Sequence, residues 1–171
     1  VFADMNVDFR VAGFRSSEGG PGLQYLGPLS HPADELAAAD LVLHGSRFDT
    51  FGRVVYEAMA WGSLPVTVDN PAFTSVFREN EECFLLSTRD PARGAHELRG
   101  IVDALAANPA RYGAMRAANH ARVRAEFSPN AMVQRTEALC TRLLAAPRPA
   151  RSFGPDDLAA TDLDAFGAVL D

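Results

Sequence analysis

The chain has 171 residues, of which 47% are hydrophobic, as expected for one well-packed globular domain. Its formal charge of −6 argues against nonspecific nucleic-acid binding, and the lack of lysine excludes a phosphate-loop lysine or a pyridoxal Schiff base in these residues. The sequence contains no long apolar run and no basic-then-apolar leader pattern, so we predict a cytoplasmic location.

The two cysteines, Cys83 and Cys140, stand far apart and lack the spacing of metal ligands. This spacing argues against a disulfide framework. We therefore predict that both are thiols in the hydrophobic core.

The chain begins with two short strands and a short helix. Val7 to Gly13 alternates apolar and polar residues and ends at a glycine, which predicts a strand. After the Ser/Gly/Pro-rich loop Phe14 to Gly22, a second strand, Leu23 to Leu26, is closed by Gly27 and Pro28. His31 to Ala37, with its early proline, predicts a short helix.

The most informative stretch is Asp40 to Asp69. Leu41 to Leu43 forms a short buried strand, and the loop Arg47 to Gly52 leads into a helix with apolar residues at i, i+3 and i+4 spacing. Leu64 to Val68 resumes a β-branched run, so the unit is strand, loop, helix and strand and favours a parallel sheet. Asp49 or Thr50 can cap the helix.

This unit suits a ligand that carries phosphate. The unpaired N–H groups and the dipole of a helix N-terminus favour an anion, and Gly52 lets the backbone approach a phosphate closely. Glu57 lies about five residues into the helix, roughly 7 to 8 Å along its axis, which suits a ribose joined to a diphosphate at the helix start. Asp49 in the loop can accept hydrogen bonds from hydroxyls. His44, at a strand end facing this cleft, is either a ligand contact or a structural residue.

The rest of the chain is mainly helical. A turn and a short helical segment occupy Asp69 to Phe77, and Cys83 to Leu86 is a last strand. Three helices are expected to follow, over Ala92 to Ala107, Arg111 to Phe127 and Pro129 to Leu144, with Ser128 as the N-cap of the third. The second has an Arg-rich outer face at Arg116, Arg122 and Arg124, which we interpret as a solvated face rather than a nucleic-acid patch. The acidic tail 147–171 is expected to be flexible, with a weak helix over Leu158 to Leu170.

The residues of the central stretch resemble a signature of the retaining GT-B glycosyltransferases of family 4. That signature is an acidic residue, seven residues, then Glu, followed by Ala-Met-Ala-x-Gly-x-Pro-Val. In this chain the corresponding stretch reads Asp49-Thr50-Phe51-Gly52-(x4)-Glu57-Ala58-Met59-Ala60-Trp61-Gly62-Ser63-Leu64-Pro65-Val66, with two residues rather than one between Gly62 and Pro65. The resemblance implies a doubly wound, Rossmann-like parallel sheet, the C-terminal half of a GT-B fold, followed by C-terminal helices.

The resemblance also implies roles for individual residues. Asp49 would contact hydroxyls of the donor sugar and Glu57 the ribose hydroxyls, and these two form the predicted catalytic pair. The predicted donor-binding set consists of Gly13, Ser46, Arg47, Thr50, Phe51, Gly52 and Arg53. Three positions depart from the family pattern: Asp49 is more often Glu, and Ser75 and Cys83 stand where Glu and Gly are usual.

Plainer interpretations of single residues stay open. Arg53 and Glu57 can be only a surface ion pair, and Asp49 only a helix cap. Gly13 can be only a turn glycine, and Arg47 or Arg15 only a solubilising residue rather than a phosphate contact. The joint spacing favours a donor site.

The predicted function is transfer of a hexose from a nucleotide diphosphate sugar to an acceptor hydroxyl with retention of configuration. No cofactor and no metal are predicted, and the triplet Asp162-Leu163-Asp164 is taken as a chance match to a metal-binding motif. By resemblance, the first strand and helix and an N-terminal acceptor domain are missing, so residues 1–146 form the donor-binding domain, poorly active alone. Membrane association through the missing half is possible. The alternatives are a non-catalytic nucleotide-binding or partner-binding domain and, more weakly, a nucleotide-sugar epimerase.

Overall fold

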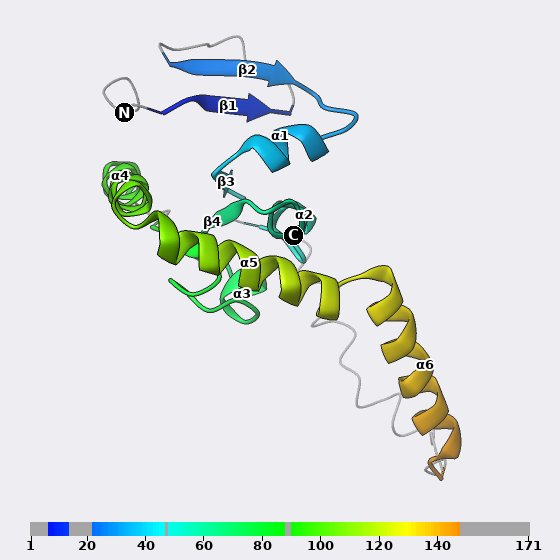
Figure 1. Ribbon diagram of the computed structural model, residues 1–171. Helices are drawn as coiled ribbons and strands as arrows, with labels where there is room; N and C mark the ends of the chain where they lie inside the picture. Colours follow the sequence, from blue (N-terminus) through cyan, green and yellow to red (C-terminus); the bar gives the residue numbers. More distant parts are fainter. Residues whose placement is uncertain (1–6, 14–21, 47, 88–89, 148–171) are drawn as a thin grey trace, which may run out of the picture. The chain divides into compact units, whose positions relative to one another are not determined.

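The computed structural model describes residues 7–13, 22–46, 48–87 and 90–147. Figure 1 shows the elements in chain order. They are β1 (Phe9–Ala12), β2 (Leu23–Gly27), α1 (Ala33–Ala38), β3 (Leu41–His44), α2 (Arg53–Trp61), β4 (Leu64–Val68), α3 (Pro71–Thr74), β5 (Phe84–Leu86), α4 (Pro91–Ala107), α5 (Pro109–Glu126) and α6 (Pro129–Ala145). The predicted elements that fall within the described residues are confirmed, with bounds that differ by a few residues.

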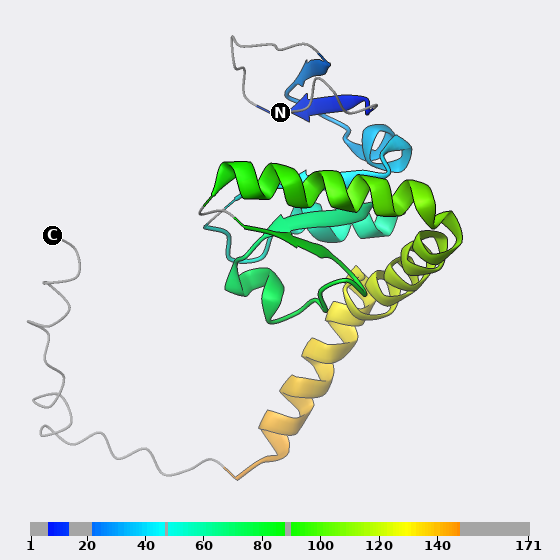
Figure 2. The same cartoon turned by 90° about the vertical axis from the view of Figure 1, so that its left-hand side faces the viewer.

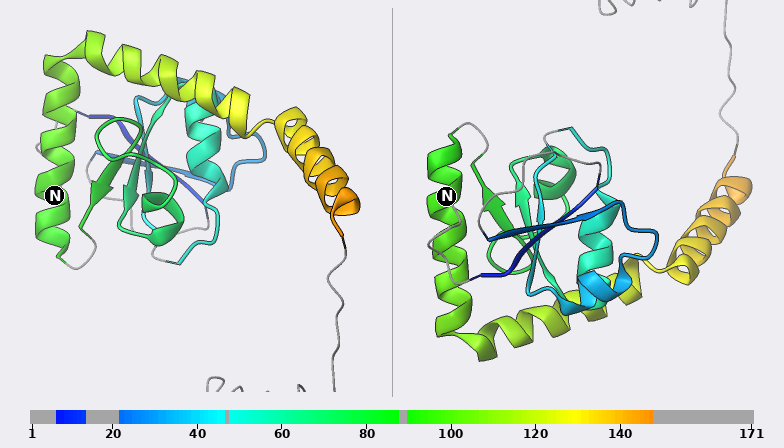
Figure 3. Two further views of the ribbon diagram at one scale, coloured as in Figure 1. Left: turned by 90° about the horizontal axis from the view of Figure 1, so that it is seen from below. Right: turned by 90° about the horizontal axis from the view of Figure 1, so that it is seen from above.

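The strands form two parallel sheets. β1 pairs with β2, and β3, β4 and β5 form a second sheet in that order. Helix α2 connects β3 to its parallel neighbour β4, which is the crossover that the sequence predicts. In Figure 3 the second sheet lies between α2 on one side and α4 on the other. The predicted α/β, Rossmann-like fold class is confirmed.

The middle strand β4 explains why the second sheet is stable. All five of its residues are buried and all but Thr67 are apolar, so β4 has a nearly continuous apolar run rather than an alternating pattern. One apolar cluster joins α2 to α5 and contains Val55, Tyr56, Met59, Phe73, Phe77, Cys83 and Val123. A second joins the strands to α4 and α5 and contains Leu64, Val66, Phe84, Leu86, Leu98, Tyr112 and Met115. Figure 2 shows α4 running along this sheet.

Local signals set the helix ends. Gly62 ends α2 in the left-handed conformation, with φ 89°, and its N–H bonds back into the helix. Asp90 caps α4, because its carboxylate accepts from the N–H groups of Ala92 and Arg93, and a proline follows it. The hydroxyl of Ser128 likewise accepts from the N–H of Ala131 at the start of α6. The predicted cap at Ser128 is therefore confirmed.

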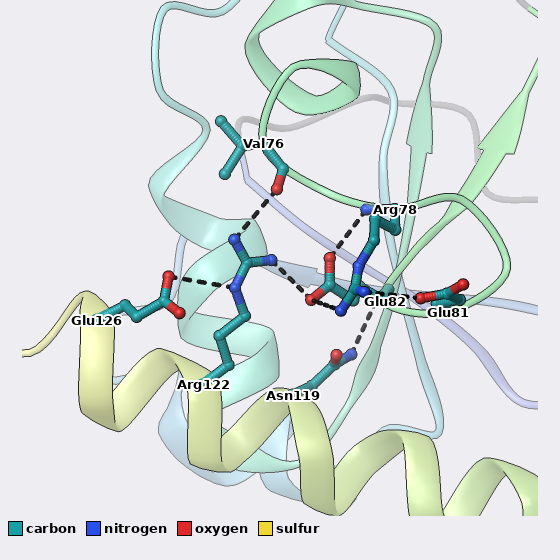
Figure 4. Close-up of polar contacts among 7 residues, drawn as sticks. All are labelled: Val76, Arg78, Glu81, Glu82, Asn119, Arg122 and Glu126. Carbon is teal, nitrogen blue, oxygen red and sulfur yellow. Dashed lines mark hydrogen bonds and ion pairs between the residues drawn. The ribbon is translucent and has the colours of Figure 1, made fainter.

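A buried carboxylate fastens α5 to the segment before β5, as Figure 4 shows. Glu82, 5% exposed, binds Arg122 of α5 at 2.7 Å and Arg78 at 3.3 Å. Asn119 donates to the backbone carbonyl of Glu82 at 2.8 Å. The interpretation of Arg122 as part of a solvated face is wrong, because its side chain is only 25% exposed and also donates to the carbonyl of Val76.

The cysteine prediction is half right. Cys83 is fully buried, but Cys140 is exposed. The physical reason is that α6 has no buried residue among those described, so apolar positions on this helix do not mark a core. Burial, followed by the charges of Glu79 and Glu82, raises the pKa of the Cys83 thiol to about 12.

The difference in burial between Cys83 and Cys140 predicts a difference in their reactivity. A thiol-specific reagent such as dithiobis(nitrobenzoate) at neutral pH is expected to modify Cys140 quickly and Cys83 only after unfolding, because a buried, protonated thiol is a poor nucleophile. Absorbance of the released thiolate measures this. In the variant Cys140→Ser, the fast phase disappears; a fast phase that survives would show that Cys83 is accessible in the folded chain.

The chain divides into two compact units, Val1–Met132 and Val133–Asp171, and the boundary lies within α6. The predicted division at residue 146 stays a prediction. The described helices include none that is long and apolar enough to cross a membrane. The predictions for Arg15, Arg47, Leu158 to Leu170 and the acidic triplet fall outside the described residues.

Candidate functional site

The loop between β3 and α2 is organised by the carboxylate of Asp49. Its Oδ1 accepts from the backbone N–H of Phe51 at 2.9 Å and of Gly52 at 2.7 Å. Its Oδ2 lies 3.0 Å from Nε2 of His44, the last residue of β3. The two backbone N–H groups, and to a smaller extent His44, lower the pKa of Asp49 below its usual value. Asp49 is therefore ionised at neutral pH.

The predicted helix cap at Asp49 or Thr50 is wrong. The N-cap of α2 is Gly52, which adopts the left-handed conformation with φ 62° and ψ 52° and uses no side chain as a cap. The carboxylate of Asp49 binds the N–H groups of Phe51 and Gly52, which precede the first helical residue, Arg53. Asp49 thus stabilises the loop, and glycine supplies the turn into the helix.

Gly52 is also pressed against α3. A Cβ atom at this position would overlap Cε1 and Cζ of Phe73, whose side chain is fully buried. The ring of His44 meets the same Phe73 edge-on, with the ring centroids 5.4 Å apart and the planes at 89°. Both ends of the loop are consequently fixed by one buried aromatic ring.

An aromatic side chain of the loop rests on the helix. Phe51 is 51% exposed and stacks on Tyr56 of α2, with a centroid distance of 4.5 Å and an interplanar angle of 7°. Tyr56 is in turn packed against Phe77 and Phe127. This stacking anchors the loop on α2.

The second predicted catalytic residue, Glu57, is bound to Arg53. Oε1 of Glu57 lies 2.9 Å from Nε of Arg53, and the two side chains are 37% and 84% exposed. This is the surface ion pair that the i, i+4 spacing allows. It leaves the second carboxylate oxygen of Glu57 for another partner.

The remaining predicted residues differ in their surroundings. The hydroxyl of Ser46 donates to the carbonyl of Phe48 at 3.1 Å, so Ser46 shapes the loop. Thr50 is exposed. Gly13 has φ 131°, and its N–H donates to the carbonyl of Gly27 at 2.9 Å, which places it at the end of the first sheet and not in this loop.

Sequence reasoning missed two contributors to this site, Tyr56 and Phe73. Each is an ordinary apolar position in its helix, and no local signal distinguishes it from the rest of the core. A separate surface depression lies at the carboxyl ends of β4 and β5 and contains none of the predicted site residues. It is lined by Asp69, Glu79, Leu85, Leu86, Ser87, Arg93 and Glu97.

Residues 4–104 match the family model described as glycosyl transferases group 1, and the chain belongs to this family. It is 38% identical over 92 residues to D-inositol 3-phosphate glycosyltransferase 1 of Catenulispora acidiphila, covering 53% of this chain and 21% of that protein. It is 34% identical over 139 residues to glycogen synthase of Bordetella parapertussis, covering 75% of this chain and 26% of that protein. The chain thus spans about a quarter or less of these relatives' lengths.

Solved structures share the fold. Anabaena Alr3699/HepE in complex with UDP superposes with a TM-score of 0.60 at 24% identity, over 70% of this chain and 32% of that one. TarM superposes with a TM-score of 0.60 at 18% identity, over 80% of this chain and 29% of that one. The described part of this chain shares the α/β fold of these structures, and the predicted GT-B type fold class is confirmed.

Proposed function

We propose that this chain is the donor-binding part of a retaining glycosyltransferase of family 4, which transfers a hexose from a nucleotide diphosphate sugar to an acceptor hydroxyl. The observation that carries the proposal is that the family match includes the whole loop-and-helix unit from Asp49 to Glu57. One of the fold neighbours, Anabaena Alr3699/HepE, has been determined with UDP and with UDP-glucose, which agrees with such a donor.

In the proposed mechanism, the protein positions the donor and stabilises its departing charge. The start of α2 carries the positive end of the helix dipole, which favours the negative charge that grows on a diphosphate as the glycosidic bond breaks. Glu57 holds the ribose hydroxyls through the carboxylate oxygen that Arg53 leaves available. Asp49 orients the sugar. Positioning of this kind supplies much of the rate in group-transfer reactions.

We propose that the acceptor binds to residues outside this chain. Because the chain spans only 21% to 32% of the relatives and structures described above, we expect these residues alone to bind donor weakly and to turn over little. The absence of a metal requirement and the cytoplasmic location stay predictions. A non-catalytic nucleotide-binding domain of the same fold is the alternative, and donor binding with no detectable sugar transfer or donor hydrolysis would favour it.

Titration calorimetry tests the donor site. UDP and GDP, each free and sugar-linked, are titrated into the wild-type chain and into Glu57→Ala. We expect saturable binding of one nucleotide series and a loss of tenfold or more in the variant, because a hydrogen bond to a charged group contributes about 1.5–3 kcal/mol.

The matched control is Glu137→Ala on α6, which removes an exposed glutamate from a helix outside the site. It is expected to bind like the wild type. Equal affinities of wild type and Glu57→Ala would exclude Glu57 as a ribose contact, and no binding at millimolar ligand would contradict the proposed function.

A further inference from the structure

His44 is held in one orientation by three elements of the fold. It ends β3 and pairs with Thr67 of β4 in the parallel register. Its ring packs edge-on against the buried Phe73 of α3, and its Nε2 points to Oδ2 of Asp49 at 3.0 Å. The His44 side chain is 19% exposed and that of Asp49 26%, so the pair is partly shielded from water.

The carboxylate of Asp49 is nearly saturated with hydrogen bonds. A carboxylate offers about four acceptor directions. Two are used on Oδ1, by the N–H groups of Phe51 and Gly52, and one on Oδ2, by His44. One direction on Oδ2 is left. Asp49 can therefore accept a hydrogen bond from a ligand hydroxyl in one direction, whereas a carboxylate without these partners could accept hydroxyls from several directions.

We propose that His44 is a positioning residue, which fixes Oδ2 of Asp49 so that it accepts one hydroxyl of the donor sugar in one geometry. The inference rests on the proposed function, since it takes Asp49 as the sugar contact. It assigns His44 no contact with the nucleotide. The imidazole donates through Nε2, and both the neutral ring with its proton on Nε2 and the protonated ring can make this bond.

If His44 only positions Asp49, its loss should lower the affinity gained from the sugar but leave the affinity for the free nucleoside diphosphate unchanged. A general loss of structure would lower both. Without His44, Asp49 keeps its two backbone partners, and the start of α2 keeps its conformation. The affinity for the free nucleoside diphosphate then stays near the wild-type value. The extra affinity supplied by the sugar falls, because the carboxylate oxygen that receives the hydroxyl is no longer oriented.

The test compares His44→Leu and His44→Gln with the wild type by titration calorimetry, using the preferred nucleoside diphosphate and its sugar-linked form. The readout is the ratio of the two dissociation constants. We expect His44→Leu to reduce the affinity gained from the sugar about tenfold, with nucleoside diphosphate affinity within about twofold of wild type. The amide of glutamine can donate to Asp49, so His44→Gln should recover most of the loss. His96→Leu, at an exposed position on α4, is the control and should match the wild type.

Three results would overturn the inference. The first is an unchanged sugar contribution in His44→Leu while the nucleoside diphosphate still binds. The second is an equal loss of both affinities, which would mean that His44 only maintains the loop. The third is a glutamine variant no better than the leucine variant. If the wild type binds no nucleoside diphosphate, the proposed function fails first, and the assignment of Asp49 to the sugar fails with it.

Discussion

Replacing Glu82 by leucine is expected to destabilise the unit that contains both sheets by about 3 kcal/mol, because it leaves the partly buried guanidinium of Arg122 without its closest carboxylate. The double variant Glu82→Leu/Arg122→Met is expected to recover much of this loss, since removing both charges removes the cost of burying one alone. Urea unfolding followed by circular dichroism gives the free energies of unfolding.

Arg78 supplies the matched control for this experiment. It also binds Glu82, at 3.3 Å, but its side chain is 71% exposed, so Arg78→Ala should cost less than about 1 kcal/mol. If Glu82→Leu costs no more than Arg78→Ala, the Glu82–Arg122 contact does not fasten α5 in the way described.

The same contact predicts how stability depends on pH. Burial acts to raise the pKa of Glu82, but the N–H and guanidinium of Arg78 and the charge of Arg122 outweigh it, so the pKa in the folded chain is lowered. A group of this kind stabilises the fold above the ordinary carboxyl pKa, and the contribution is lost as the pH falls through the lowered value. Glu82→Gln should therefore flatten the acid side of the stability profile.

The second large effect is expected for Gly52→Ala. The alanine would have to adopt the left-handed φ of 62°, and its Cβ atom would overlap the ring of Phe73. The left-handed backbone costs about 1–2 kcal/mol for alanine, and overpacking against a fixed ring typically adds about 1–3 kcal/mol. We expect the loop to lose the geometry in which Asp49 binds the N–H of Gly52, so donor binding should weaken as well.

Gly62→Ala separates the two causes. Gly62 is also left-handed, with φ 89°, but a Cβ there would meet no atom within 4 Å. It reports the backbone cost alone, and the excess in Gly52→Ala is the cost of the overlap. In the background Phe73→Leu, Gly52→Ala should cost less than in the wild type. Equal unfolding free energies for the two glycine variants would show that Phe73 yields without penalty.

The fold could be predicted from the sequence because its signals are local. The apolar run of β4, the glycine after α2 and the caps at Asp90 and Ser128 each act through neighbours in the chain. The position of Glu82 could not be predicted in this way. It follows Glu81 in the sequence and differs from it only because α5 brings Arg122 and Asn119 against one of the two.

The candidate site, like the fold, could be predicted from the sequence only in part. The spacing from Asp49 to Glu57 predicts a loop and helix with a carboxylate in each, and both are present. The sequence does not predict that the carboxylate of Asp49 occupies the N–H groups of Phe51 and Gly52, two residues of the predicted donor-binding set. That choice depends on His44 and Phe73, which reach the loop from separate elements.

We propose that a sugar nucleotide binds at the loop between β3 and α2 and at the first turns of α2. The most direct measurement is a series of ¹H–¹⁵N correlation spectra of this chain recorded during titration with UDP-glucose and with GDP-mannose. We predict that one of the two ligands shifts the backbone signals of residues 49–57 first and most. The largest shifts at the depression lined by Asp69, Ser87 and Arg93, or no shifts with either ligand, would contradict the account.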